Sequence, residues 1–443
     1  MTREPDTGTE RGERPRRRRL WPWILLGLVG LTLAAVLLTS IGVHSVASRR
    51  WADLEERQSV LLARLRADSG ERTPLPSGES TVGNAWDEYE AAVAGLALLP
   101  EADRRAVSEV LRPSRGTSIT PETLKKAGDA LAAAEPQLER FRNGARCRVA
   151  QYEIDWWRGM SSKVPSYPGL RGGEDLLAFS ARRKREGGDL DGAVEDIATG
   201  LQLARDVARV PTVLAFLIGI SMSSTALDEA REVATAPGLS ADQARRLEDL
   251  LRRGEQSLPL LADALEGEQA LINETLRQTL EGKGPDDFFP RRGLQVMLWR
   301  QGFSIRIAAA GVDEAYSRTI ADMRTVEDRP WPEAVVVHER NQGDTDNFLL
   351  NLVRISLSGA DRNLRACRAR FSLVRAVLLE RAGPGASGIP VDPFTQQPLR
   401  RREDGTKTVF WSCWIDGDDG GLGTWHPENF SDRQDLVIEY LKR

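Results

Sequence analysis

The sequence predicts a mainly α-helical protein with an N-terminal transmembrane helix, an extracytoplasmic helical bundle and a small C-terminal β-containing module. Three observations predict this fold class. Residues 20–48 contain no Asp, Glu, Lys or Arg, and from residue 84 apolar side chains recur every three or four positions over about 300 residues. That period ends near residue 390, where a short aromatic strand and a Gly/Asp-rich loop follow. We therefore divide the 443 residues into a tail, an anchor, a connecting segment and two globular parts.

The anchor, a transmembrane signal anchor, is predicted at residues 20–48. About 20 apolar residues, each rising about 1.5 Å, cross the roughly 30 Å hydrocarbon core of a bilayer, and residues 24–43 supply that length. Six arginines stand in residues 11–19 and three in residues 49–57, so residues 1–19 are expected to form a basic cytoplasmic tail. The expected location is the bacterial inner (cytoplasmic) membrane, crossed once, with the N-terminus inside and the body extracytoplasmic. The lipid bilayer is thus a predicted partner, through residues 20–48.

A cleaved signal peptide is the alternative, because residues 45–47 (Ser-Val-Ala) resemble a small-residue cleavage site. The apolar segment is longer than the roughly 7 to 15 residues of a signal-peptide core, which favours an uncleaved anchor. Both interpretations export the body.

Residues 49–83 are predicted to form a stalk and linker. Residues 51–67 continue as a charged amphipathic helix, and residues 69–83, rich in Pro and Gly, interrupt the helical pattern. We expect this segment to connect the anchor to the body.

Residues 84–382 are predicted to form an α-helical domain. Within it, residues 176–208 are expected to form a helical hairpin whose turn is Glu186-Gly187-Gly188-Asp189. The pair resembles one tetratricopeptide-like unit. Since no second copy follows at the ~34-residue period of that repeat, the sequence favours a local hairpin over a repeat array.

Residues 210–227 are a second uncharged stretch, for which a second membrane span is the alternative. The stretch contains Pro211 and five Ser or Thr residues among 18, which suits a helix packed among other helices better than one facing lipid. Residues 346–380 are predicted to form a long helix with one apolar side, on which Cys367 is expected to be a small buried residue.

The C-terminal module is predicted at residues 390–443, with a strand at residues 409–415. Its motifs are, in order, Asp392-Pro393-Phe394, Pro398-Leu399, Asp416-Gly417, Gly420-Gly421 and Asp435-Leu436-Val437. They resemble the final segment of the type II secretion major pseudopilins. The resemblance implies a calcium-binding loop with Asp416, Asp418 and Asp435 as ligands, because calcium prefers carboxylate and carbonyl oxygens. A Gly/Asp-rich turn that holds no metal is the alternative.

The whole layout also resembles a class of uncharacterised bacterial single-pass membrane proteins. The shared features are the anchor, the polar linker, the segment Asn84-Ala85-Trp86-Asp87-Glu88-Tyr89 near the start of the helical body, and the terminal Asp-Pro-Phe module. This resemblance implies the architecture and no activity.

Composition and motifs exclude several classes of function. Residues 51–443 carry 52 basic and 61 acidic side chains, so nucleic acid is not a predicted partner. One of the three histidines, His44, lies in the anchor, which excludes a three-histidine metal site in the body. The sequence patterns of zinc metalloproteases, serine hydrolases and P-loop enzymes are absent. Cys147, Cys367 and Cys413 match no disulfide framework or zinc spacing, and one disulfide with one spare thiol stays open.

The leading functional hypothesis is a non-catalytic scaffold or interaction protein of the cell envelope, with other envelope proteins as partners. We assign no catalytic residue, and calcium is the one cofactor considered. The first alternative is an envelope hydrolase in which His338, backed by Asp344 or Asp346, is the general base. Its site would lie near Tyr152, Trp156, Trp157 and His338. The competing interpretation is that His338 has a structural role and that the aromatic residues pack a loop onto the helices. The second alternative is an accessory component of a secretion or pilus-like system.

Overall fold

A computed structural model describes residues 21–113, 118–281, 303–342, 357–383, 388–413 and 436–441. Over these residues the protein is mainly helical with small sheets, so the predicted fold class is confirmed at this level. The helices are α1 Trp21–Ala67, α2 Ala85–Leu96, α3 Glu101–Leu111, α4 Pro121–Ala133, α5 Glu135–Arg146, the 3-10 helix η1 Trp156–Ser161, α6 Tyr167–Glu186, α7 Leu190–Ala208, α8 Val213–Thr235, α9 Ala241–Gln256, α10 Leu261–Leu280, α12 Phe303–Val326, α13 Trp331–Gln342 and α15 Leu357–Ala382.

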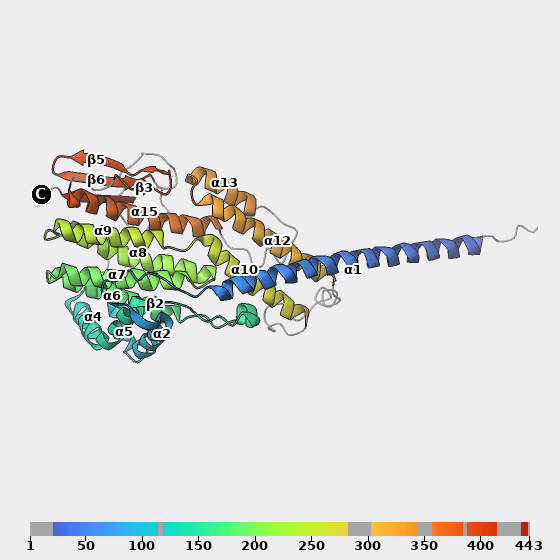
Figure 1. Ribbon diagram of the computed structural model, residues 1–443, viewed down its shortest axis with the longest axis horizontal. Coiled ribbons are helices and arrows are strands. Elements are labelled where there is room, and N and C mark those ends of the chain that lie inside the picture. Colours follow the sequence, from blue (N-terminus) through green and yellow to red (C-terminus); the bar gives the residue numbers. More distant parts are fainter. Residues whose placement is uncertain are drawn as a thin grey trace, which may run out of the picture.

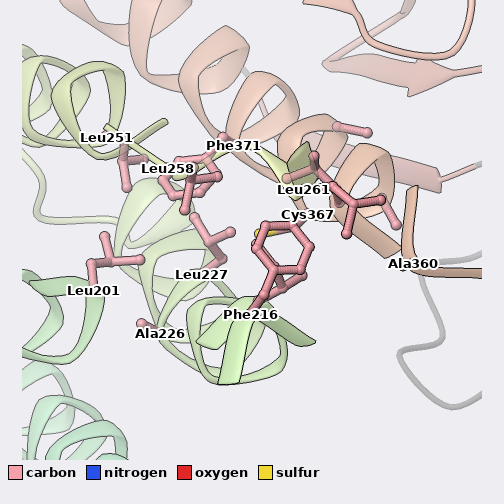
Figure 2. Packing of buried hydrophobic residues seen from close by; sticks show 14 of the residues in the cluster. Leu201, Phe216, Ala226, Leu227, Leu251, Leu258, Leu261, Ala360, Cys367 and Phe371 are labelled. Carbon is pink, nitrogen blue, oxygen red and sulfur yellow. The ribbon is translucent and has the colours of Figure 1, made fainter. Parts of the chain in front are cut away.

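The helices bury two apolar cores that meet at α7 and α8. The first core lies between α2, α3, α4, α5 and the two helices α6 and α7. The second lies between α8, α9, α10, α12, α13, α15 and the C-terminal strands, and Figure 2 shows Phe216 and Leu227 of α8 packed there with Cys367 and Phe371 of α15. Figure 1 shows α6 to α9 and α15 running side by side, with α2, α4 and α5 on one side and the sheet on the other.

The predicted hairpin is formed by α6 and α7. Gly188 adopts a positive φ of 83° in the turn, which a residue without Cβ tolerates. The side chain of Asp189 then accepts a hydrogen bond from the backbone N–H of Gly192 at 2.9 Å and so caps α7. The Glu-Gly-Gly-Asp turn predicted from sequence is thus the turn observed.

Two described helices, α1 and α8, are long and apolar enough to cross a membrane by length and composition. For α8, 61 % of the apolar window is buried inside the protein, against α6, α7, α10 and α15. Its Ser223 and Ser224 hydroxyls donate to the carbonyls of Gly219 and Ile220 at 3.0 and 3.2 Å, so they need no water. The prediction of a core helix at residues 210–227 agrees with this packing.

Helix α1 is one continuous helix of 47 residues whose two halves have different surroundings. In the first half, Leu31, Leu37 and Leu38 are 62 to 74 % exposed, and Figure 1 shows this half projecting from the body. In the second half, Ala47 and Leu54 are buried, and the helix packs along α10 and α12. Part of the segment expected to be a stalk therefore lies against the body.

The segment after α1 is held closely by the body as well. Arg72 is buried, donates to the carbonyls of Gly144 and Ala145, and forms an ion pair with Asp206 at 3.0 Å. Leu75 is buried in the second core and donates its backbone N–H to Gln202 of α7 at 2.9 Å. Strand β1 Thr81–Asn84 then pairs in parallel with β2 Cys147–Val149.

The C-terminal module packs on α15. Its strands are β3 Val391–Asp392, β4 Gln397–Pro398, β5 Arg400–Asp404, β6 Lys407–Ser412 and β7 Leu436–Leu441, with β5, β6 and β7 in one antiparallel sheet. The aromatic strand predicted at residues 409–415 is observed as β6 up to Ser412, and residues 414 and 415 lie outside the described part. Buried Asp392 accepts hydrogen bonds from Ser412 Oγ and from the backbone N–H of Phe394 and Cys413 at 2.9 to 3.0 Å. The Asp-Pro-Phe motif thus ties β3 to the end of β6.

Candidate binding cleft at the end of helix α1

Two adjoining hollows flank the C-terminal end of α1, and together we call them the root cleft. They measure about 330 and 430 Å³ and share Leu65, Asp68, Arg209 and Pro211. The first is closed by α2 and the segment 150–156, and the second by the end of α9, the loop that follows it and the first turns of α10. Because the connection from α7 to α8 carries Arg209 and Pro211, the two cores, α1 and the connecting segment all meet here.

Aromatic side chains form one wall of the first hollow. The rings of Trp86 and Tyr152 meet edge to face, with centroids 4.8 Å apart, and Trp156 lies in the same wall. Burial raises the pKa of Tyr152 to about 12, so its hydroxyl stays neutral and donates to the carbonyl of Lys163 at 3.4 Å. The Nε1–H of Trp86 is buried and has no hydrogen-bond acceptor among the described residues.

Exposed charges of both signs line the rim of the root cleft. Its exposed cations are Arg64, Arg66 and Arg209, and Glu153 and Asp155 are exposed acids of the first hollow. Asp68 accepts from the backbone N–H of Gly70 at 3.0 Å. Aromatic walls under a polar rim are typical of sites that bind a polar ligand through an apolar face.

Asp206 of α7 lies at the floor of the first hollow and is held there by buried hydrogen-bond donors. Asp206 pairs with Arg72 and accepts from the hydroxyl of Tyr89 and the side-chain N–H of Gln202, both at 2.8 Å. Burial is the main cause that raises the pKa of Tyr89, and the charge of Asp206 adds to it. Since every partner of the Asp206 carboxylate is a buried donor, this floor is rigid and its charges are neutralised.

At η1 the two neighbouring tryptophans of the predicted aromatic segment have different surroundings. Trp156 is 8 % exposed and packs on Ala270 and Leu271 of α10, whereas Trp157 is 66 % exposed. In a 3-10 helix consecutive side chains point about 120° apart, so the two tryptophans face different surroundings. Gly159 follows them at a φ of 54° and lies against Thr275 of α10. A Cβ at Gly159 would lie 2.3 Å from the hydroxyl oxygen of Thr275. Trp156 and Tyr152 thus face the root cleft, and Trp157 does not line it.

His338 lies elsewhere, in a buried cluster between α13 and α15. Its Nε2 is 2.8 Å from Asp361 Oδ2, and the same oxygen accepts from Arg365 Nε at 3.1 Å. Arg365 also donates to the carbonyls of Val326 and Pro393 at 2.7 and 2.6 Å, so the cluster connects α12, α13, α15 and the C-terminal module. Figure 1 shows α13 and α2 on opposite sides of α1 and α10. Tyr152 and Trp156 line the root cleft whereas His338 lines neither of its hollows, so the structure does not bring these residues together.

No family model, curated protein or solved structure matches this chain. The resemblance of its C-terminal motifs to pseudopilins stays a prediction. Asp416, Asp418 and Asp435 lie outside the described residues, as do Asp344 and Asp346. Across the part of the chain that is described, no group of three or more His, Cys, Asp or Glu side chains is placed to hold a metal ion.

The three cysteines are free thiols in the structure. All of them are buried, and burial raises the pKa of Cys367 to about 12, so this thiol stays protonated and unreactive. Cys367 occupies the apolar side of α15 as the sequence predicted.

The sequence interpretation missed the cations of the root cleft and Trp86. Arg209 stands between two helices and Arg66 near the end of α1, where isolated arginines in an arginine-rich chain carry no signal. Trp86 lies in a segment whose sequence pattern indicates a helix and no site. Its proximity to Tyr152 arises from the pairing of β1 with β2, which links positions 84 and 149.

Proposed function

We propose that this chain is a membrane-tethered, non-catalytic interaction protein of the bacterial cell envelope. Helix α1 crosses the inner membrane once with the N-terminus inside, and the body stands outside with the root cleft as its partner-binding site. The observation that supports this most is the continuity of α1, which carries an exposed apolar half and a docked polar half in one helix.

The docked half of α1 is fixed by a buried polar network. Asp313 of α12, which is 1 % exposed, accepts from Arg57 Nε at 2.8 Å and from the side-chain N–H groups of Gln269 and Asn273 at 2.7 Å. Gln58 of α1 donates to the carbonyl of Ala270 at 2.9 Å and accepts from Asn273 at 3.2 Å. Hydrogen bonds have strict geometry, so this network sets both the rotation and the height of α1 against α10 and α12.

A fixed α1 gives the body one height and orientation above the bilayer. Leu65 follows the end of the uncharged run at Ser48 by 17 residues, so the root cleft stands about 25 Å beyond that point along the helix axis. At that height a partner reaches the root cleft without entering lipid. This geometry suits a scaffold that presents a binding site at a set distance from the membrane.

The geometry of His338 gives the hydrolase hypothesis less support. A general base must come within hydrogen-bond reach of its substrate. His338 has 0 % exposure and pairs with Asp361, which also binds Arg365, and this cluster joins four elements of the fold. The accessory role in a secretion system depends on residues 416–435, which lie outside the described part.

Membrane fractionation and photo-crosslinking test the proposal. We expect the full chain to resist alkaline extraction from membranes, and a reporter enzyme fused after Arg443 to be active only outside the cytoplasm. A chain that alkali releases, or a reporter active in the cytosol, would contradict the anchor.

The partner site is tested with a photo-crosslinking side chain at Arg66, on the rim of the root cleft. The matched control is Lys125 of α4, whose side chain is 76 % exposed and distant from the root cleft. We expect an adduct of defined mass in intact envelopes from position 66 and none from position 125. Equal adducts from both positions would contradict a partner site in the root cleft.

A further inference from the structure

The segment that follows β2, residues 150–156, runs along the first hollow of the root cleft with the pattern of a β-strand. All of its residues line that hollow. Its side chains alternate between packed and exposed positions, which is the period of an extended chain. The packed residues are Tyr152, Ile154 and Trp156, and the exposed residues are Gln151, Glu153 and Asp155.

The hydrogen bonds of β2 show which edge of this segment is open. On one edge β2 pairs with β1. On the other edge it pairs with the chain after α1, where the N–H of Ala150 donates to the carbonyl of Gly70 at 2.9 Å. This second pairing stops at Ala150, because the N–H of Gly70 donates to the side chain of Asp68 at 3.0 Å instead. The edge beyond Ala150 therefore has no neighbouring strand, and it lies on the side of the end of α1.

The backbone groups along this edge have no partner in the part of the chain that the structure describes. In a strand, the N–H and C=O of every second residue point to the same edge, so the edge of Ala150 continues with Tyr152 and Ile154. The C=O of Ala150, both backbone groups of Tyr152 and the N–H of Ile154 make no hydrogen bond there. On the opposite edge, the N–H and C=O of Gln151 bond to the side chain of Asn84 at 3.0 and 2.8 Å.

We infer that an extended segment of a partner polypeptide occupies the first hollow and pairs with this open edge as an added β-strand. It rests on the proposed function, since it names the kind of partner that the root cleft binds. An added strand presents its own N–H and C=O groups at the spacing of the open ones, which a helix does not. Residues 150–154 span about 13 Å at about 3.3 Å per residue, so four or five residues of the partner cover the edge.

Charges indicate which side chains the added segment carries. Glu153 and Asp155 are exposed, line the hollow and form no ion pair with any described residue. Opposite charges on neighbouring strands attract when they share a face of the sheet, so we expect Lys or Arg beside these two acids. Arg66 and Arg209 line the same hollow and repel an uninterrupted basic run. The segment that fits therefore carries basic side chains at alternate positions.

Residue-resolved hydrogen exchange of the full chain tests the pairing. The chain is compared in native envelope vesicles and after purification in detergent as a single polypeptide. We expect the amides of Tyr152 and Ile154 to exchange about tenfold or more slowly in the envelopes, because the partner accepts their hydrogen bonds. The amide of Glu153 points to the other edge and is the internal control, with equally fast exchange in both samples.

Charge reversal tests the kind of segment, with the photo-crosslinking side chain at position 66 as the readout. One chain carries Glu153→Lys and Asp155→Lys. The matched control carries Glu122→Lys and Asp129→Lys on α4, where the two native side chains are 76 and 62 % exposed. We expect the first chain to lose the adduct several-fold and the control to keep it. An adduct that is unchanged in the first chain would contradict a segment with basic side chains.

The outcomes separate this inference from the proposed function. If Tyr152 and Ile154 exchange equally fast in both samples while position 66 still forms its adduct, the partner site stands and the added strand is wrong. Slow exchange of both amides in the purified chain would mean that the chain covers its own edge, which overturns the inference. An adduct whose added mass is lipid or glycan overturns it as well. If position 66 forms no adduct at all, the proposed partner site and this inference fail together.

Discussion

The two halves of α1 belong to one continuous helix but have opposite surroundings. The first half exposes leucines and carries no charge from Trp21 to Ser48, and in our proposal lipid surrounds it. The second half places Gln58 in a buried position, where the side chain must find hydrogen-bond partners on α10 and α12. The comparison teaches that the uncharged run ends at Ser48, nine residues before the side-chain hydrogen bonds from α1 to the body at Arg57 and Gln58.

We predict the largest effect for a substitution that removes the hydrogen bonds between the second half of α1 and the body. Asp313→Ala leaves Arg57, Gln269 and Asn273 without their shared acceptor, and we expect the free energy of unfolding to fall by about 3 to 5 kcal/mol. The control is Asp129→Ala on α4, whose partner Lys125 is exposed, with an expected change below about 1 kcal/mol. Denaturant unfolding of the full chain in detergent measures both. Equal losses would mean that the network around Asp313 does not hold α1.

The next prediction compares the two halves directly by the same substitution. Leu54→Ala removes a side chain that is 2 % exposed, and we expect a loss of about 3 kcal/mol. Leu37→Ala removes one that is 62 % exposed, and stability in detergent should change by less than about 0.5 kcal/mol. Similar losses at both positions, in the same unfolding assay, would contradict the division of α1.

A third prediction concerns Glu174, a buried carboxyl group that, unlike Asp313, accepts no hydrogen bond among the described residues. Both oxygens of Glu174 on α6 are buried without a hydrogen-bond partner among the described residues. Burial raises the pKa of Glu174 to about 8, the nearby Asp175 charge adds to the shift, and Arg112 opposes it. The folded state then binds this proton more tightly than the unfolded state, whose pKa is near 4.5.

The sign of the pH dependence follows. The protonated Glu174 stabilises the folded state fully at a pH below its unfolded pKa. This contribution to the free energy of unfolding falls by about 1.4 kcal/mol for each pH unit between the unfolded pKa near 4.5 and the folded pKa of about 8. Glu174→Gln should flatten this fall. We expect a gain of about 2 kcal/mol at pH 8, limited by the unpaired amide. Unfolding measured from pH 5 to 8 tests it, and an unchanged slope in the variant would show that Glu174 is not the titrating group.

The sequence predicted the features that depend on local patterns. The uncharged run gives α1 its first half, the Glu186 to Asp189 turn gives the hairpin, and the Ser/Thr content of residues 210–227 distinguishes a core helix from a second span. It did not predict the docking of α1, because Gln58 and Asp313 are 255 residues apart and each resembles an ordinary surface residue in its own segment.

Only part of the candidate site could be predicted from sequence, because some of its residues are brought together by tertiary packing alone. Tyr152 and Trp156 belong to one aromatic segment and line the root cleft, whereas Trp86 and Arg209 reach it only through the tertiary fold. For His338, the partner is Asp361 on another helix, and no local pattern links the two. Which acid a histidine meets is decided by how α13 packs on α15.

Hydrogen exchange of the full chain in lipid vesicles tests most directly whether α1 is both anchor and part of the body. We predict that the amides of residues 51–67 exchange as slowly as those of α10 and α12, since they open only when that core opens. Exchange of residues 51–67 at rates typical of an isolated solvated helix, with α10 and α12 still protected, would contradict the docked α1 and the fixed orientation built on it.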